Sequence, residues 1–230
     1  MNEGGAVPMA ARSIAGIPGN TEIMMVGCLR TPHTVTEYPV SYRDVYADTR
    51  FGASMFSRMG VQAGSVVMCT SGSSEYAHFW PYQLAVESLN ACVAIGENFM
   101  FDAGRAEMFM RRLPIKVAFG VTDAILNGMG ALNLDVAKAF APAEVICARD
   151  GAADRLAALG FSPWRMVSLG VAFGFVSPQG ETFHDREEWL IEEAKGELLI
   201  TAVTPRAKPV VRLPTGVKGS VNADHAFSLA

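Results

Sequence analysis

Several features that mark common protein classes are absent from this sequence of 230 residues. It has no lysine/arginine run, and a net charge of −4 argues against nucleic acid or an anionic membrane as a partner. No apolar stretch is long enough to span a membrane, and the N-terminus lacks the apolar core of a signal peptide. The four cysteines form no Cys-x-x-Cys pair, which predicts no zinc knuckle or redox motif. We expect a cytoplasmic protein without a metal site.

The composition nevertheless supports a folded core, because 50% of the residues are hydrophobic and only 18% are charged. Residues 1–20, rich in Gly, Ala and Pro, predict a flexible arm. From residue 21 to residue 160, short apolar runs alternate with segments of helical periodicity. The expected strands are 65–69, 92–95, 116–119 and 144–147, and the expected helices are 41–60, 76–90, 103–113, 122–127, 133–140 and 152–159.

Strands that are apolar along their whole length are typical of a parallel sheet covered by helices on both faces. The first unit, 21–160, is therefore predicted to be an α/β lobe. After Gly160 the pattern changes to short strands joined by Gly/Pro turns, which predicts a smaller β-rich lobe at 161–221. Residues 222–230 are expected to form a tail.

Ligands of such parallel sheets bind beyond the carboxyl ends of the strands. Here those ends are the segments 70–75, 96–101, 120–123 and 148–151. The first is the most polar and could cradle an anion, although an ordinary turn with a serine cap explains it as well. For Thr122 and Asp150, a role as helix caps is the simpler explanation. The candidate ligand-binding residues are Ser71, Gly72, Ser73, Tyr76, Gly120, Thr122 and Asp150.

Four segments together resemble a known family. They read VSYRDV at 40–45, GVQAGSVV at 60–67, LNACVAI at 89–95 and ELLITAVTPRAKPVVR at 197–212. The residues of these segments and their order along the chain are similar to those of the phenylacetate–coenzyme A ligase branch of the adenylate-forming (acyl-CoA synthetase) superfamily. The resemblance implies the N-terminal domain fold of these enzymes. It also implies their chemistry, in which ATP converts a carboxylic acid to an acyl-adenylate and coenzyme A receives the acyl group.

The sequence departs from that family in its phosphate loop and its metal site. The segment 26–35, VGCLRTPHTV, stands in place of a loop ending in Gly-Lys-Pro and has no lysine. Its remaining candidates are Gly27, Arg30, Thr31 and His33. The Thr-Glu pair that supplies the family's magnesium-binding glutamate is missing from 165–173, so no metal ligand is implied.

A third departure concerns the ribose, because Val217 stands where the family has an aspartate. Arg212 and Thr215 remain as ribose-side candidates, and Asp150 matches the acidic residue that lies beside the adenine. The family's C-terminal domain, with its catalytic lysine, would follow near the point where this sequence stops.

Three hypotheses follow. In the leading one the chain has no catalytic residues of its own and is a non-adenylating relative that binds an aryl or acyl carboxylate-like molecule or serves as a subunit. In the second it is the adenylation subunit of an active ligase that uses ATP and coenzyme A with a separate C-terminal domain. In the third it is a structural homodimer. No nucleic-acid or membrane partner is expected.

Overall fold

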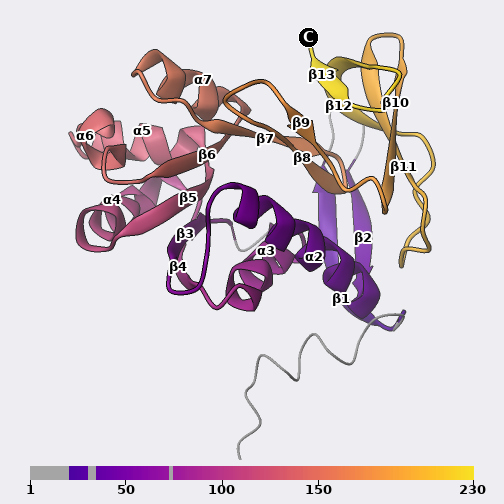
Figure 1. Ribbon diagram of the computed structural model, residues 1–230, viewed down its shortest axis with the longest axis horizontal. Helices are drawn as coiled ribbons and strands as arrows, with labels where there is room; N and C mark the ends of the chain where they lie inside the picture. The colour runs from indigo at the N-terminus through magenta and orange to yellow at the C-terminus, as the bar shows by residue number, and fades with distance from the viewer. Residues whose placement is uncertain (1–20, 31–34, 73–74) are drawn as a thin grey trace, which may run out of the picture.

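The computed structural model describes residues 21–30, 35–72 and 75–230. Its strands form a seven-stranded sheet, a four-stranded antiparallel sheet and a two-stranded hairpin (Figure 1). The expected arm at residues 1–20 lies outside the described residues. Within the described residues, no helix combines the length and apolar character needed to cross a membrane.

The seven-stranded sheet has the order β4-β3-β5-β6-β7-β8-β9. Its first five members run parallel, and β8 and β9 extend it in antiparallel fashion. The α/β class expected from the sequence is therefore confirmed. The strands are β3 (Val66–Thr70), β4 (Cys92–Gly96), β5 (Ile115–Val121), β6 (Val145–Arg149), β7 (Trp164–Leu169), β8 (Ala172–Val176) and β9 (Thr182–Phe183).

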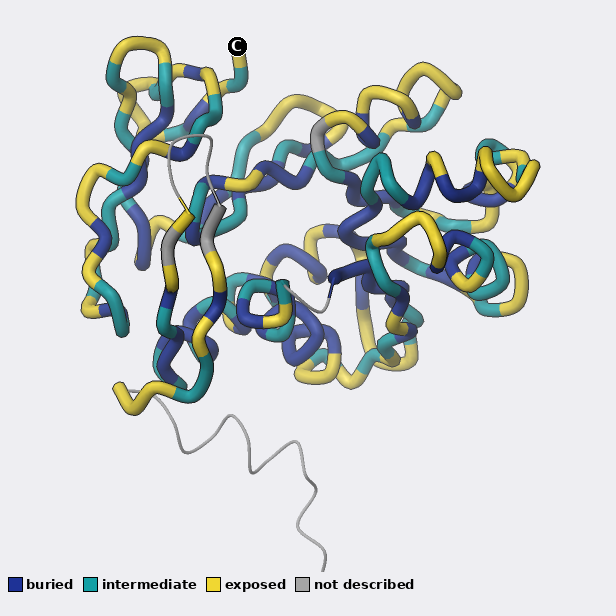
Figure 2. The backbone as a smooth tube through the Cα atoms, turned by 180° about the vertical axis from the view of Figure 1, so that it is seen from behind, coloured by how far each residue is buried: buried dark blue, intermediate teal, exposed yellow. Residues whose placement is uncertain are grey.

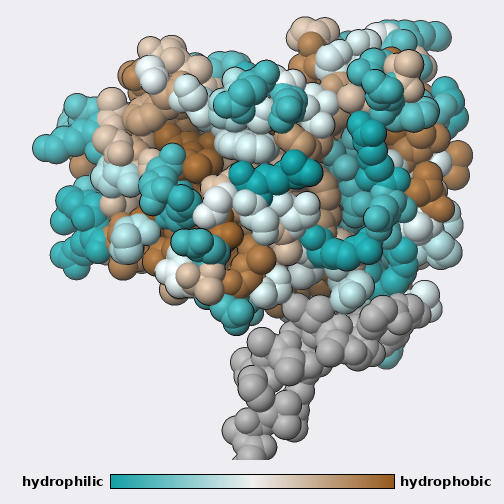
Figure 3. Space-filling model, viewed as in Figure 1, coloured by the Kyte–Doolittle hydropathy of each residue, from teal (hydrophilic) through white to brown (hydrophobic). Residues whose placement is uncertain are grey.

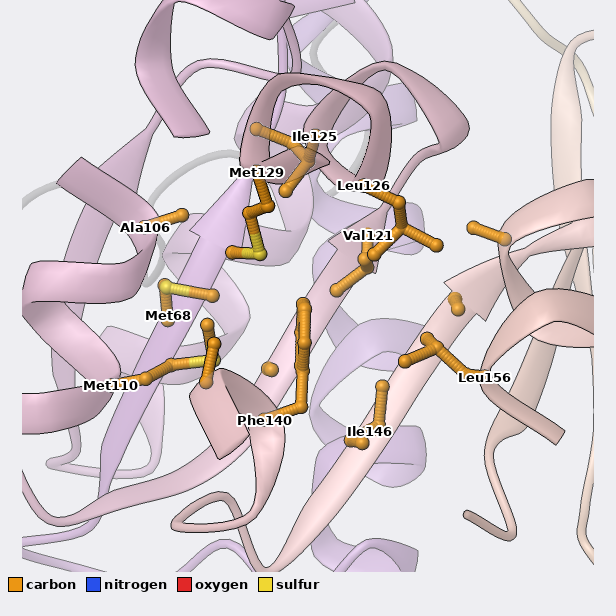
Figure 4. Packing of buried hydrophobic residues seen from close by; sticks show 14 of the residues in the cluster. Met68, Ala106, Met110, Val121, Ile125, Leu126, Met129, Phe140, Ile146 and Leu156 are labelled. Carbon is orange, nitrogen blue, oxygen red and sulfur yellow. The ribbon is translucent and has the colours of Figure 1, made fainter. Parts of the chain in front are cut away.

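Successive residues of β3 point to opposite faces of this sheet, as the pleat requires. Val67 and Cys69 pack in the cluster that includes residues of α2 (Tyr42–Arg58) and α3 (Tyr76–Ser88). Met68 joins the cluster on the opposite face, where Phe140 and Ile146 also pack (Figure 4). The helical elements on that face are η2 (Met100–Asp102), α4 (Ala103–Arg112), α5 (Asp123–Ala131), α6 (Val136–Phe140) and α7 (Asp150–Ala158).

Helix α2 begins where the sequence predicts it. Ser41 is the N-cap, with its hydroxyl accepting from the Asp44 backbone N–H at 3.2 Å, and the Asp44 carboxylate accepts from the Ser41 N–H at 2.9 Å. This reciprocal capping box satisfies two donors that would otherwise be unpaired at the helix start. The short pair Ser41 and Asp44 therefore carried enough information to locate the helix.

The antiparallel sheet contains β10 (Trp189–Ala194), β11 (Glu197–Ala202), β12 (Leu213–Val221) and β13 (Phe227–Leu229). Its apolar residues share a cluster with α3 and with the hairpin of β1 (Ile23–Arg30) and β2 (Val35–Ser41). Figure 2 shows the buried residues following the strands of the interior, with exposed residues on the outer turns. In Figure 3, hydrophilic side chains cover much of the visible face, with hydrophobic patches between them.

Three expected boundaries differ in the structure. Residue 160 does not separate two sheets, because β7, β8 and β9 continue the seven-stranded sheet. The expected tail 222–230 contains β13, which pairs with β12 and buries Phe227. The apolar pattern within the β-rich segment also predicts a short strand at 210–213, whereas β12 begins only at Leu213. Short strands cannot be assigned to one of two sheets by local alternation, since pairing is decided by distant neighbours.

The segment 26–35, which stands in place of the family's phosphate loop, lies partly in the paired strands β1 and β2, with Cys28 opposite Glu37, and its residues 31–34 lie outside the described residues. One further expectation needs correction. The expected helix at 133–140 is shorter and starts at Val136, where the Asp135 side chain accepts from the Lys138 N–H.

Two glycines of α5 provide a test of its packing. A methyl group on Gly128 would collide with the Met100 backbone and lie 2.7 Å from Cβ of Ala103, whereas one on Gly130 would meet nothing within 4 Å. Gly128→Ala should therefore destabilise the protein by about 1–3 kcal/mol through overpacking. Gly130→Ala should be neutral or stabilising by up to about 1 kcal/mol. Urea unfolding of both variants measures the difference, and equal effects would contradict this packing of α5 on η2.

Candidate functional site

The four loops at the carboxyl ends of β3, β4, β5 and β6 are joined by hydrogen bonds. The Ser71 N–H donates to the Gly96 carbonyl at 3.1 Å, which links the ends of β3 and β4. The Thr122 hydroxyl donates to the Asn98 carbonyl at 3.0 Å, which links the ends of β4 and β5. The expected meeting of these loops at one edge is therefore seen.

An ion pair between Glu75 and Arg149 lies at the centre of this edge. The guanidinium donates to both oxygens of Glu75, at 2.6 Å and 2.8 Å. Glu75 also accepts from the Asn98 side-chain amide at 2.6 Å and from the Gly72 backbone N–H at 3.2 Å. Burial acts to raise the pKa of Glu75, but the hydrogen bonds and charge of Arg149 outweigh it and hold that pKa below its usual value.

Arg149 is the last residue of β6, and its guanidinium is held in place by an aromatic ring. The guanidinium carbon lies 4.7 Å from the ring centre of Phe79, a fully buried side chain of α3. Two polar atoms beside the ion pair, Nε of Arg149 and Oδ1 of Asn98, are buried and have no hydrogen-bond partner among the described residues. The edge is thus preorganised but retains unmet hydrogen-bonding capacity.

Glycines allow the loops to approach each other closely. Gly120 has φ of +81°, and a Cβ atom there would lie 2.6 Å from the Thr70 carbonyl oxygen. A Cβ atom at Gly72 would lie 2.8 Å from Oδ1 of Asn98 and 3.2 Å from the Phe99 ring. Both candidates therefore have a packing role at this edge.

The other candidates at the edge are placed as follows. Ser71 is buried, and Tyr76 is exposed and stacks on Trp80 with ring centres 5.7 Å apart. Thr122 caps α5, because its hydroxyl accepts from the Ile125 N–H. Helix α7 starts at residue 150 with Arg149 as its N-cap, so Asp150 does not cap a helix from residue 152. Ser73 lies outside the described residues.

Of the remaining candidates, those whose side chains the structure describes bond or pack elsewhere. Thr215 donates to the Leu198 carbonyl at 2.8 Å, and Arg212 pairs with Glu192, so both are engaged within the antiparallel sheet. Gly27 lies in β1 against Ala77 of α3. Arg30 ends β1, and Thr31 and His33 lie outside the described residues.

Sequence reasoning missed three residues of the edge, Glu75, Asn98 and Arg149. The sequence did contain a signal for two of them. Glu75 ends the loop after β3 and Arg149 ends β6, so residues of opposite charge stand at two strand ends that share the carboxyl edge. Among the described residues, no group of three or more His, Cys, Asp or Glu side chains could hold a metal ion.

A second polar site is a small cavity of about 20 Å³ between α2, α3, β8 and β10. Its walls include the aromatic side chains Phe51, Tyr82, Phe173 and Trp189, and its polar groups are Asp48, His78 and Asp185. Burial raises the pKa of Asp185 to about 6 and lowers the pKa of His78. A cavity of this size holds about one water molecule.

Solved structures identify this arrangement of elements. A 2-hydroxyisobutyryl-CoA ligase in complex with 2-HIB-AMP and CoA aligns with a TM-score of 0.68 and 16% identity, over 91% of this chain and 56% of the ligase. The fold is that of the adenylate-forming ligases. The o-succinylbenzoate-CoA synthetase of Bacillus subtilis aligns with a TM-score of 0.60 and 10% identity, over 91% and 49% of the two chains.

The N-terminal subdomain of NpsA from Klebsiella oxytoca, in complex with 3-hydroxyanthranilyl-AMSN, aligns with a TM-score of 0.58 and 9% identity, over 90% of this chain and 62% of that chain. No protein-family model and no curated protein matches the sequence. The chain spans about half the length of the CoA ligases that it matches. Likeness at such low identity establishes the fold, and activity has to be argued from the site.

The raised pKa of Asp185 leads to a pH-dependent prediction. Above about pH 6 the folded protein holds an unfavourable buried charge at this residue, whereas the unfolded carboxyl, with an ordinary pKa of 3.8, ionises readily. Asp185→Asn should therefore raise the melting temperature at pH 8. The gain should shrink as the pH falls through about 6, where the folded carboxyl becomes protonated, and vanish below about 4. Thermal unfolding at pH 4, 6 and 8 tests this, with Asp224→Asn at an exposed turn as control; a gain independent of pH would contradict it.

Proposed function

We propose that this chain binds a small organic acid at the carboxyl edge of its parallel sheet and does not form an acyl-adenylate by itself. The observation that supports this is the Glu75–Arg149 ion pair. In this pair the carboxylate of the chain's own Glu75 binds the Arg149 guanidinium at the centre of the edge, so the positive charge there is already compensated. We regard the chain as a divergent relative of the aryl- and acyl-CoA ligases, including the phenylacetate type.

A bound triphosphate needs uncompensated positive charge or a metal ion. At this edge the described charges are paired with each other. Arg149 is neutralised by Glu75, Arg105 lies 3.0 Å from Asp102, and Arg155 lies 3.1 Å from Asp123. This pairing favours a singly charged or neutral ligand over ATP, and the function needs no ATP, AMP or coenzyme A.

The first prediction of this proposal concerns nucleotide. Titration calorimetry with ATP–Mg²⁺ should give no binding in the micromolar range, and a panel of aryl and acyl acids should give no pyrophosphate release. A known AMP-forming CoA ligase provides the positive control. Micromolar ATP binding, or release of pyrophosphate by the chain alone, would contradict the proposal. Release only after a separate C-terminal domain is added would instead support the adenylation-subunit alternative.

A second candidate function is association of two copies, and exposed apolar residues favour it. Ile95, Phe99, Met100 and Phe101 lie in or after β4, which is the edge strand of the seven-stranded sheet, and the Phe101 side chain is 77% exposed. Clusters of exposed aromatic and aliphatic side chains mark association surfaces.

Light scattering should then give the mass of a dimer, and Phe101→Ser should shift it towards the monomer. Val211→Ser is the matched control, since Val211 is 73% exposed but lies next to β12 in the antiparallel sheet. A monomeric mass for the unmodified chain at high concentration, or equal effects of the two substitutions, would exclude this surface as the dimer contact.

A further inference from the structure

The Glu75 carboxylate is bound in the way that a free carboxylate ligand would be. It accepts two hydrogen bonds from Arg149, one from the Asn98 amide and one from the Gly72 backbone N–H. A guanidinium fork that binds both oxygens is the preferred receptor for carboxylates in proteins. These donors come from the ends of three different strands, so the arrangement is not a local helix pair.

The donors are held in place independently of Glu75. The face of the Arg149 guanidinium rests on the buried Phe79 ring. Asn98 is fixed through its carbonyl, which accepts from the Thr122 hydroxyl. Loss of Glu75 would therefore leave a receptor that already has its binding geometry, which lowers the entropic cost of accepting another carboxylate.

The ion pair is accessible enough to exchange partners. The side chains of Arg149 and Glu75 are 26% and 29% exposed, so Glu75 can return to water without being buried unpaired. Replacing one carboxylate by another preserves the local charge. A phosphate group with two charges would exceed the single guanidinium available, which favours a monoanion.

An exposed aromatic side chain near the ion pair indicates what the rest of the ligand would contact. Phe99 is 39% exposed, and its ring lies 3.2 Å from the position that a Cβ atom on Gly72 would take. A flat apolar surface next to a carboxylate receptor is suited to an aromatic acid, whose ring would stack on it.

We propose that Arg149 and Asn98 form the receptor for the carboxylate of a small aromatic acid, and that Glu75 occupies this receptor in the unliganded chain. This assignment rests on the function proposed above. Glu75 acts as an internal competitor, because only the fraction of molecules in which it has left Arg149 can bind the acid.

Titration with benzoate, by calorimetry and by ligand-observed NMR, tests the assignment. Glu75→Gln removes the competing charge and should tighten benzoate binding at least tenfold. The double variant, with Arg149→Gln added, should bind benzoate at least tenfold more weakly than Glu75→Gln alone. Glu107→Gln is the matched control, because it breaks the exposed Glu107–Arg111 pair on α4, and it should change the affinity less than twofold. The affinity for benzyl alcohol, which has no charge, should be unchanged by any of these substitutions.

Circular dichroism and thermal unfolding establish that each variant is folded. If Arg149→Gln unfolds, Arg149→Lys takes its place, because it keeps the charge but loses the two-pronged guanidinium. Equal benzoate affinity of the unmodified chain and Glu75→Gln would overturn the receptor assignment while leaving small-acid binding intact. Failure of Glu75→Gln to bind benzoate at all would also overturn it. ATP-dependent pyrophosphate release would instead remove the proposed function and leave the receptor assignment standing.

Discussion

The arrangement of the two sheets depends on one buried arginine. The Arg206 side chain is 1% exposed and pairs with Asp48 of α2 at 2.8 Å and with Glu188, just before β10, at 3.2 Å. Asp44, at the start of α2, lies 3.7 Å away, and the guanidinium stacks on Trp189 with a distance of 4.5 Å to the ring centre. A buried charge that loses its partners is strongly destabilising, so this cluster fixes α2 against the antiparallel sheet.

The same chemistry serves two different purposes in this molecule. Around Arg206, several carboxylates converge on a guanidinium that water does not reach, and loss of these partners together would leave a buried charge unpaired. The Glu75–Arg149 pair has a single carboxylate and is partly exposed. Its net contribution to stability is correspondingly small, since solvent screens such pairs. The first arrangement determines the fold, whereas the second could change partners at a lower cost, as the proposed binding site requires.

The sequence predicted features that depend on near neighbours. The capping box of Ser41 and Asp44 located α2, and the uniformly apolar strands predicted a parallel sheet with helices on both faces. It could not predict contacts between distant residues. Asp44 and Arg206 lie far apart along the chain, as do Glu75 and Arg149, and nothing in the local pattern of either pair indicates its partner.

The separation of core from edge explains how a ligase fold can carry a different site. The apolar clusters lie on the faces of the seven-stranded sheet, whereas Gly72, Glu75, Asn98 and Arg149 lie at or beyond the ends of its strands. Substitutions at those ends change charge and hydrogen bonding without altering the packing that defines the fold. A chain can therefore keep the sheet while the charges at its edge pair with one another. Such pairing lowers affinity for a polyphosphate more than for a monoanionic acid, because Coulomb attraction grows with the charge of the ligand.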